Sequence, residues 1–149
     1  TAALCISVVL LVQALFMADG GVTAIGTNIT LMALVGCFVG YAVFRLVAMV
    51  LPKRLSSVPV AAAAGAFVSV PAAALVFTLL FVLGGTAPFD TSDLLVAMLG
   101  WHTVIGVGEA VVTGLVVGSV VSVRPDLVYG ARRLVPAAEL EIRAAVPSP

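Results

Sequence analysis

Charged side chains are scarce in this sequence. Only 9% of its 149 residues are Asp, Glu, Lys or Arg, whereas 62% are hydrophobic and the mean hydropathy is +1.28. A water-soluble domain has about 25% charged residues, so this chain lacks the polar surface that a soluble fold needs. The seven basic and seven acidic residues cancel, which leaves no net charge to attract nucleic acid. The composition predicts an all-α, polytopic membrane helix bundle.

Residues that bind metals or perform nucleophilic chemistry are also few. There is one histidine, His102, and the two cysteines, Cys5 and Cys37, have neither metal-site nor CxxC spacing. A zinc hydrolase needs about three protein ligands, which His102 and the isolated Glu109 cannot supply. The sequence has no phosphate-binding loop or dinucleotide fingerprint. These shortages argue against an enzyme.

Four apolar stretches with few or no charges approach the length of about 20 residues that a helix needs to cross about 30 Å of hydrocarbon. We expect about four transmembrane helices, at about residues 2–17, 28–50, 58–83 and 91–123. Together they form a membrane bundle over residues 1–123, followed by a polar tail over residues 124–149.

The ends of these helices carry recognisable stop and start signals. Pro52 ends the second stretch, and Asp90 is placed to cap the fourth. Residues 22–28 contain Thr, Gly and Asn, and we expect this segment to be non-helical. The first stretch is slightly short and starts without a basic n-region, so we expect a fragment or a processed chain.

The few charges predict how the bundle sits in the membrane. Basic residues concentrate in cytoplasmic loops, and here they cluster at the end of the second stretch and just after it (Arg45, Lys53, Arg54) and after the fourth (Arg124, Arg132, Arg133). The loops that contain Asp19 and Asp90 have none. We therefore expect a cytoplasmic carboxyl terminus and a multi-pass protein of a prokaryotic cell membrane.

Small residues recur every four positions on three of the predicted helices. The series are Gly106, Ala110, Gly114, Gly118 and Ser122 on the fourth; Ala61, Gly65, Ser69 and Ala73 on the third; and Gly36 and Gly40 on the second. Such stripes let helix backbones approach closely in lipid. They predict intimate packing within the bundle, and homodimerisation is a second use that the pattern leaves open.

Glu109 lies near the middle of the fourth helix, where an ionised carboxylate costs about 2.5–3.5 kcal/mol on insertion scales. His102 precedes it by seven residues, so His102, Gly106 and Glu109 share one helix face. This face is either part of an ion route or a set of polar contacts between helices. A separate group of turn residues and oxygen donors, Asp19, Gly20, Gly21, Gly26 and Asn28, can cap helices or approach a ligand.

Two segments resemble a known family. The stretches ALFMADGGVTAIGTN (residues 14–28) and GWHTVIGVGEAVVTG (residues 100–114), with the exit Arg-Pro-Asp-Leu at residues 124–127, are similar to the CbiM/NikM family. These are the cobalt/nickel substrate-binding subunits of energy-coupling factor transporters, and the resemblance covers most of residues 10–128.

The resemblance implies a subunit that captures Co²⁺ or Ni²⁺ outside the cell for ATP-driven import, which would feed cobalamin biosynthesis. A transmembrane coupling subunit and separate ATPase subunits would be its partners, and a small auxiliary membrane subunit is a further candidate. No resident cofactor is expected. The supporting residues carried over are Asp19, Gly20, Gly21, Gly26 and Asn28 in the outer loop, and His102, Gly106, Gly108 and Glu109 on the fourth helix.

The sequence departs from the family in two respects. Members begin with a Met-His-Ile-Pro-Asp-Gly segment that holds the metal, and this segment is absent from the sequence. The first metal ligands are therefore expected to lie upstream of Thr1. Leu31 also stands where the family places an Asn before the residue that matches Met32.

Two other functions stay open at this stage. One is a small four-helix proton-coupled exporter that uses Glu109 as its proton carrier. The other is a membrane scaffold without transport activity, in which His102 and Glu109 are structural and the small-residue stripes bind partner subunits.

Overall fold

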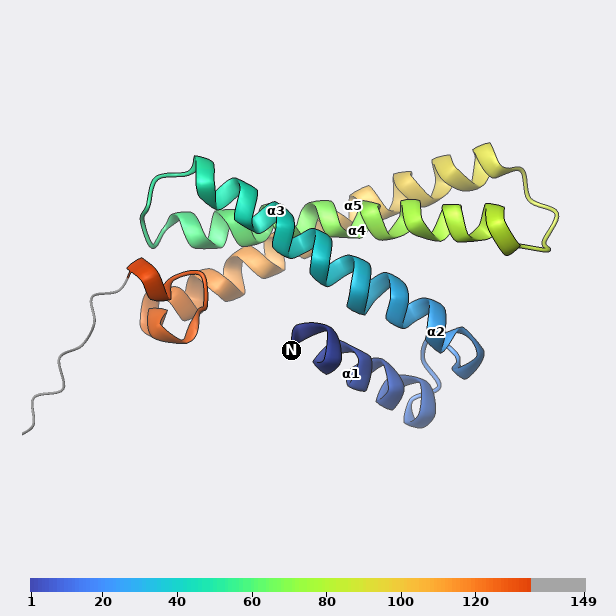
Figure 1. The fold of residues 1–149 in the computed structure, drawn as a ribbon, viewed down its shortest axis with the longest axis horizontal. Helices are drawn as coiled ribbons and strands as arrows, with labels where there is room; N and C mark the ends of the chain where they lie inside the picture. Colours follow the sequence, from blue (N-terminus) through green and yellow to red (C-terminus); the bar gives the residue numbers. More distant parts are fainter. Residues whose placement is uncertain (135–149) are drawn as a thin grey trace, which may run out of the picture.

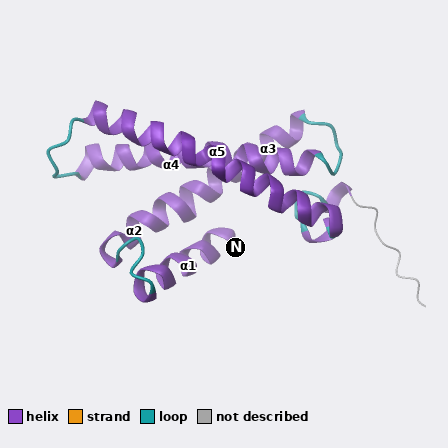
Figure 2. Cartoon of the chain, turned by 180° about the vertical axis from the view of Figure 1, so that it is seen from behind, coloured by secondary structure: helices purple, strands orange, loops and turns teal. Residues whose placement is uncertain are grey.

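The computed structural model describes residues 1–134, and helices dominate this range (Figures 1 and 2). The helices are α1 Ala2–Phe16, α2 Ile25–Asn28, α3 Gly36–Val50, α4 Ser57–Gly84 and α5 Thr91–Val123, with a π-helical segment η2 at Ile29–Val35 and 3₁₀ turns η1 at Val22–Ala24, η3 at Pro125–Leu127 and η4 at Arg132–Leu134. The predicted tail falls mostly outside the described residues. Its separation from the bundle stays a prediction.

Three helical stretches are long and apolar enough to cross a membrane. They are Val22–Val50, Ser57–Gly84 and Thr91–Val123, whereas α1 is a shorter apolar helix of 15 residues. At 1.5 Å per residue, α1 is about 22 Å long and α5 about 50 Å. The predicted all-helical membrane fold is confirmed.

The second stretch corrects one expectation. We expected residues 22–28 to be non-helical, but they form η1 and α2 and continue into η2 and α3. Thr and Gly do not break the helix here because their unfavourable helix propensity is at most about 1 kcal/mol per residue and tertiary contacts can override it. Contacts between α1 and both α2 and η2 also support the segment.

The helices form a layered arrangement around α4. α4 and α5 run side by side along the long axis, and α3 crosses them on one side (Figure 1). α1 lies beside the α2 end of the same long helical stretch (Figure 2). As a result α4 is in contact with α3, η2 and α5.

Close packing in the bundle depends on glycines. A Cβ atom built on Gly65 of α4 would lie 2.6 Å from the carbonyl oxygen of Gly40 on α3. On α5, a Cβ at Gly106 would lie 2.9 Å from the Phe67 carbonyl oxygen of α4, and one at Gly118 would contact Pro59 at 3.7 Å. The predicted packing of the small-residue stripe on the fourth helix is confirmed.

The start of α5 is fixed by the predicted cap. The Asp90 carboxylate accepts a hydrogen bond from the Ser92 backbone N–H at 2.8 Å, and Asp93 lies in the first turn. The bonds from Ser92 hold the pKa of Asp90 below its ordinary value. Asp90 therefore caps α5 as an ionised group.

We expect Asp90→Ala to lower the thermal midpoint of the detergent-solubilised protein by a few degrees at pH 7, because the first turn loses its acceptor. A depressed pKa contributes stability above the unfolded pKa of about 3.9. This contribution disappears as the pH falls through the folded value, so the difference between the variant and the parent should narrow in acid. Asp90→Asn retains a capping oxygen and should lose less; equal losses from both variants would contradict the capping role.

Candidate functional site

The loop between α1 and η1 depends on residues with left-handed backbone conformations. Gly20 and Gly21 have φ angles of 74° and 69°, and Ala18 has a φ of 52°. The Asn28 amide donates a hydrogen bond from Nδ2 to the Gly20 carbonyl oxygen at 3.0 Å. A Cβ on Gly20 would lie 2.8 Å from the same nitrogen. Gly20 is therefore needed both for its φ angle and to let Asn28 tie the loop to α2.

The helix that follows Asn28 is wound as a π-helix from Ile29 to Val35. The Gly36 backbone N–H bonds to the Leu31 carbonyl oxygen, five residues back. π-helical turns are rare and often occur at functional sites. This one places Leu31 and Met32 on a cavity wall.

His102 is held in one orientation by its own helix. Its Nδ1 lies 2.7 Å from the Met98 carbonyl oxygen. A carbonyl oxygen only accepts, so Nδ1 carries the hydrogen in this bond. In the neutral imidazole, the Nε2 lone pair then remains available for a proton or a metal ion.

A cavity of about 500 Å³ joins the two parts of the sequence that carry the predicted site residues. We call it the Asn28–Glu109 cavity. It lies between the α2 and η2 segment, the middle of α4 and the first half of α5. Its lining residues are Asn28, Leu31, Met32, Gly36, Ser69, Val70, Ala73, Ala74, Phe77, Met98, His102, Ile105 and Glu109. Asn28, His102 and Glu109 provide polar groups in a mostly apolar wall.

The remaining predicted residues lie elsewhere. Gly106 is buried against Phe67 and Pro71 of α4, where it serves packing. The Cβ position of Gly108 has no neighbour within 4 Å among the described residues, and neither residue lines the cavity. Asp19, Gly20, Gly21 and Gly26 belong to the adjoining loop and the start of α2, and only Asn28 connects that loop to the cavity.

The family profile described as "Cobalt uptake substrate-specific transmembrane region", CbiM, matches residues 1–127. The chain belongs to the CbiM family. The resemblance predicted from the sequence is thus confirmed, and the chain is a multi-pass membrane protein of a prokaryotic metal transporter family.

Several proteins are similar to this CbiM-family chain. A candidate metal transport protein of Methanocaldococcus jannaschii is 40% identical over 132 residues, which are 85% of this chain and 57% of that protein. A fused nickel transport protein, NikMN, of Rhodobacter capsulatus is 36% identical over 145 residues, 89% of this chain and 41% of that protein. The chain therefore spans about half the length of these relatives.

A solved structure has the same fold. A crystal structure described as that of a truncated transition metal transporter matches with a TM-score of 0.63 and 32% sequence identity. The match covers 80% of this chain and 60% of the other. At this identity, the likeness extends the CbiM-family assignment from sequence to helix arrangement.

Some cavity residues of this CbiM-family chain were not predicted. Met98 is one turn before His102 and accepts its Nδ1–H through its backbone, and Phe77 completes the wall from α4. Met98 could have been identified from the sequence, because a residue four positions before His102 on a helix offers its carbonyl oxygen to the histidine side chain. Nothing local in the sequence marks Phe77, because its position depends on how α4 and α5 pack.

The described part of the chain lacks a complete metal site. Across residues 1–134, no three His, Cys, Asp or Glu side chains lie close enough together to hold a metal ion. In this chain of the CbiM family, His102 and Glu109 both line the Asn28–Glu109 cavity, and no further His, Cys, Asp or Glu in the described residues joins them there.

Proposed function

We propose that this chain is the membrane-embedded part of a substrate-capture subunit that imports Co²⁺ or Ni²⁺. The observation that carries the proposal is the Asn28–Glu109 cavity, which is lined by Asn28 from the first segment that resembles the CbiM/NikM family and by His102 and Glu109 from the second. CbiM is a transport family, and the relatives named above are named for metal or nickel transport. ATP hydrolysis would take place on separate partner subunits, joined through a transmembrane coupling subunit.

His102 suits a role near a borderline divalent cation. Imidazole nitrogen is a good ligand for Ni²⁺ and Co²⁺. A histidine whose Nδ1–H is bonded to a backbone carbonyl presents Nε2 in the form that binds metals. His102 makes this bond with Met98. His102 would either bind the ion after it leaves the primary ligands or orient those ligands.

Glu109 would contribute charge to the same cavity. It lies seven residues beyond His102 on α5, about 10 Å along the helix axis. A carboxylate in an apolar wall favours a nearby cation, since charge is stabilised by an opposite charge where water is scarce. The proposal assigns the primary ligands to the amino-terminal His segment implied by the family resemblance. Asn28 then braces the loop beside that site.

Cobalt delivered by such a subunit would serve cobalamin biosynthesis, the use that the family resemblance implies. Growth that depends on cobalamin made in the cell, in medium with limiting cobalt, tests this part separately from metal binding.

Metal-dependent thermal stabilisation of the purified subunit, with its amino-terminal segment present, tests the proposal. A ligand at 100 times its dissociation constant stabilises a protein by about 2.7 kcal/mol, so CoCl₂ or NiCl₂ should raise the thermal midpoint by several degrees. MgCl₂ is the matched control, because Mg²⁺ prefers oxygen ligands and sheds water reluctantly. Equal stabilisation by all three salts, or by none, would contradict the proposed substrate.

A further inference from the structure

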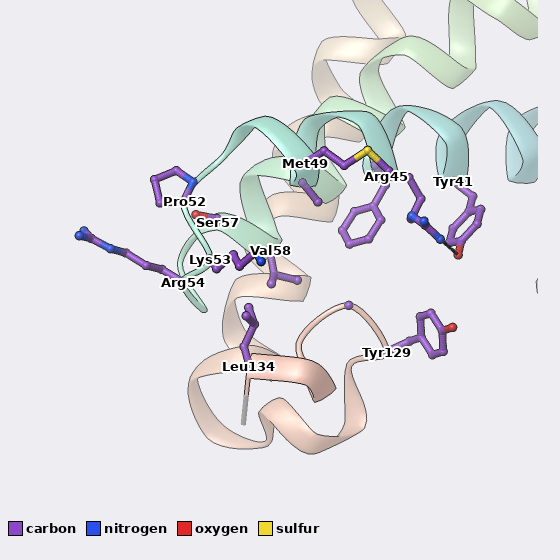
Figure 3. A pocket seen from close by; sticks show the side chains of 13 residues that line it. Tyr41, Arg45, Met49, Pro52, Lys53, Arg54, Ser57, Val58, Tyr129 and Leu134 are labelled. Carbon is purple, nitrogen blue, oxygen red and sulfur yellow. Dashed lines mark hydrogen bonds between the residues drawn. The ribbon is translucent and has the colours of Figure 1, made fainter. Parts of the chain in front are cut away.

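A second cavity lies at the other end of α3, far along the helix from the π-helical segment. It has a volume of about 390 Å³, within the range of about 300–1,000 Å³ that is usual for ligand-binding cavities. Its walls come from the end of α3, the turn that leads into α4, and the segment after α5 (Figure 3). We call it the Arg45–Lys53 cavity.

The lining of this cavity is basic. Arg45, Lys53 and Arg54 contribute to it, and the described lining contains no acidic side chain. Within residues 1–134, the recorded ion pair is Arg124 with Asp126, at 2.8 Å, which lies outside the lining. The three cations of the cavity therefore have no carboxylate partner in the described part of the chain.

Two of the cations are directed toward the cavity. The Arg45 guanidinium donates a hydrogen bond to the Tyr41 hydroxyl at 3.2 Å and lies 5.9 Å from the centre of the Tyr41 ring. Figure 3 shows the Lys53 side chain directed toward Val58, whereas Arg54 extends away. The Tyr129 phenol completes the polar lining. The contact with Tyr41 thus orients the Arg45 guanidinium along the wall of the cavity.

The ends of the long apolar helices around the cavity indicate a position at a membrane surface. The three long helical stretches end at Val50, begin at Ser57 and end at Val123. Arg45 is five residues before Val50, about 7.5 Å inside the end of its helix, where long basic side chains extend to the headgroup layer. Met49 and Val50 are 67% and 87% exposed on the chain, so apolar surface for acyl chains adjoins the cations.

We propose that the Arg45–Lys53 cavity binds the phosphate of an anionic glycerophospholipid. The Arg45 guanidinium would contact the phosphate oxygens, the Tyr129 hydroxyl would donate a further hydrogen bond, and the Lys53 ammonium would attract the anionic headgroup from another part of the lining. Arginine and lysine form strong charge-assisted bonds with phosphate, and basic pockets between transmembrane helices bind anionic headgroups. A soluble phosphate compound would leave the adjoining apolar surface uncovered.

Native mass spectrometry of the detergent-purified full-length protein, with added phosphatidylglycerol or phosphatidylcholine, tests this site. The parent should retain phosphatidylglycerol in preference to phosphatidylcholine. Arg45→Gln with Lys53→Gln should lower that retention by about tenfold or more, since each basic side chain near an anionic lipid is worth about fivefold. Arg54→Gln removes one positive charge from the same turn, but the Arg54 side chain extends away from Lys53 and Val58, so this variant should lower retention much less than the double variant does.

Two further measurements complete the test: a folding control and a comparison with soluble phosphates. Arg45→Lys keeps the charge and should retain most of the lipid, which separates loss of binding from misfolding. Sodium phosphate and glycerol phosphate should not raise the thermal midpoint, whereas phosphatidylglycerol should raise it in the parent and not in the double glutamine variant.

Three results would overturn the proposal. They are an equal loss in Arg54→Gln and the double variant, equal stabilisation by free phosphate, and retention that rises several-fold only after Glu139→Gln with Glu141→Gln. The last result would show that carboxylates of the chain itself occupy the cavity.

Discussion

Gly65→Leu should strongly destabilise the helix bundle. The Cβ alone would lie 2.6 Å from the Gly40 carbonyl oxygen and 3.6 Å from the Cβ of Phe44. Backbone cannot move aside as a flexible side chain can, so α3 and α4 must separate along their crossing. Overpacking of this kind costs about 3 kcal/mol. Thermal unfolding of the detergent-solubilised protein should show a large drop in midpoint, with loss of monodisperse protein on size exclusion.

Gly100→Leu is the matched control for this effect. Gly100 is also a helical glycine, but its Cβ position has no neighbour within 4 Å in the described structure. The added side chain there should leave stability unchanged or raise it, because leucine forms helix more readily than glycine. A Gly65 variant as stable as the Gly100 variant would show that the crossing of α3 and α4 adapts, contrary to the packing observed.

His102→Ala should reduce metal uptake strongly in the assembled transporter. Removing a residue that binds or orients a metal group costs about 10- to 100-fold in affinity or activity, and Glu109→Gln, which removes the charge from the same cavity, should act in the same direction. Uptake of radioactive cobalt or nickel by cells that express the complete transporter measures both. This expectation depends on the proposed function, whereas the packing prediction does not.

Thr103→Val is the control for the uptake experiment. Thr103 is next to His102 but is exposed, bonds to the Leu99 carbonyl oxygen of its own helix and does not line the Asn28–Glu109 cavity. Its replacement should leave uptake near the parent level. Unchanged uptake in the His102 and Glu109 variants would instead favour the scaffold alternative, in which both residues are structural.

Local signals in the sequence predicted much of the fold. The Asp90 cap, the stop at Pro52 and the small residues on α4 and α5 each act through near neighbours in the chain or through a repeat of one helical turn. The structure confirms the four helices and the close approach of Gly106 to α4. The assignment to the CbiM family likewise follows from continuous motifs. The cytoplasmic position of the carboxyl terminus stays a prediction.

Contacts between distant segments were harder to predict. The π-helical segment needs only a change of bonding from four residues back to five, and its apolar residues suit either form. The presence of Asn28, His102 and Glu109 in one cavity depends on how the helix from Val22 to Val50 crosses α4. Arg45 was seen only as a marker of orientation, because nothing in the sequence places Tyr129 beside it in one cavity.

The π-helical winding of Ile29–Val35 affects how this sequence aligns with relatives that have one residue fewer in the segment. A bond that reaches five residues back accommodates one residue more than an α-helical turn, so the segment resembles an insertion absorbed without a loop. An alignment with a relative that is α-helical here needs a gap of one position. Without that extra residue, the part of the helix before it, Asn28 included, would turn by about 100° relative to the rest. We therefore expect the register of this segment to decide whether Asn28 lines the cavity.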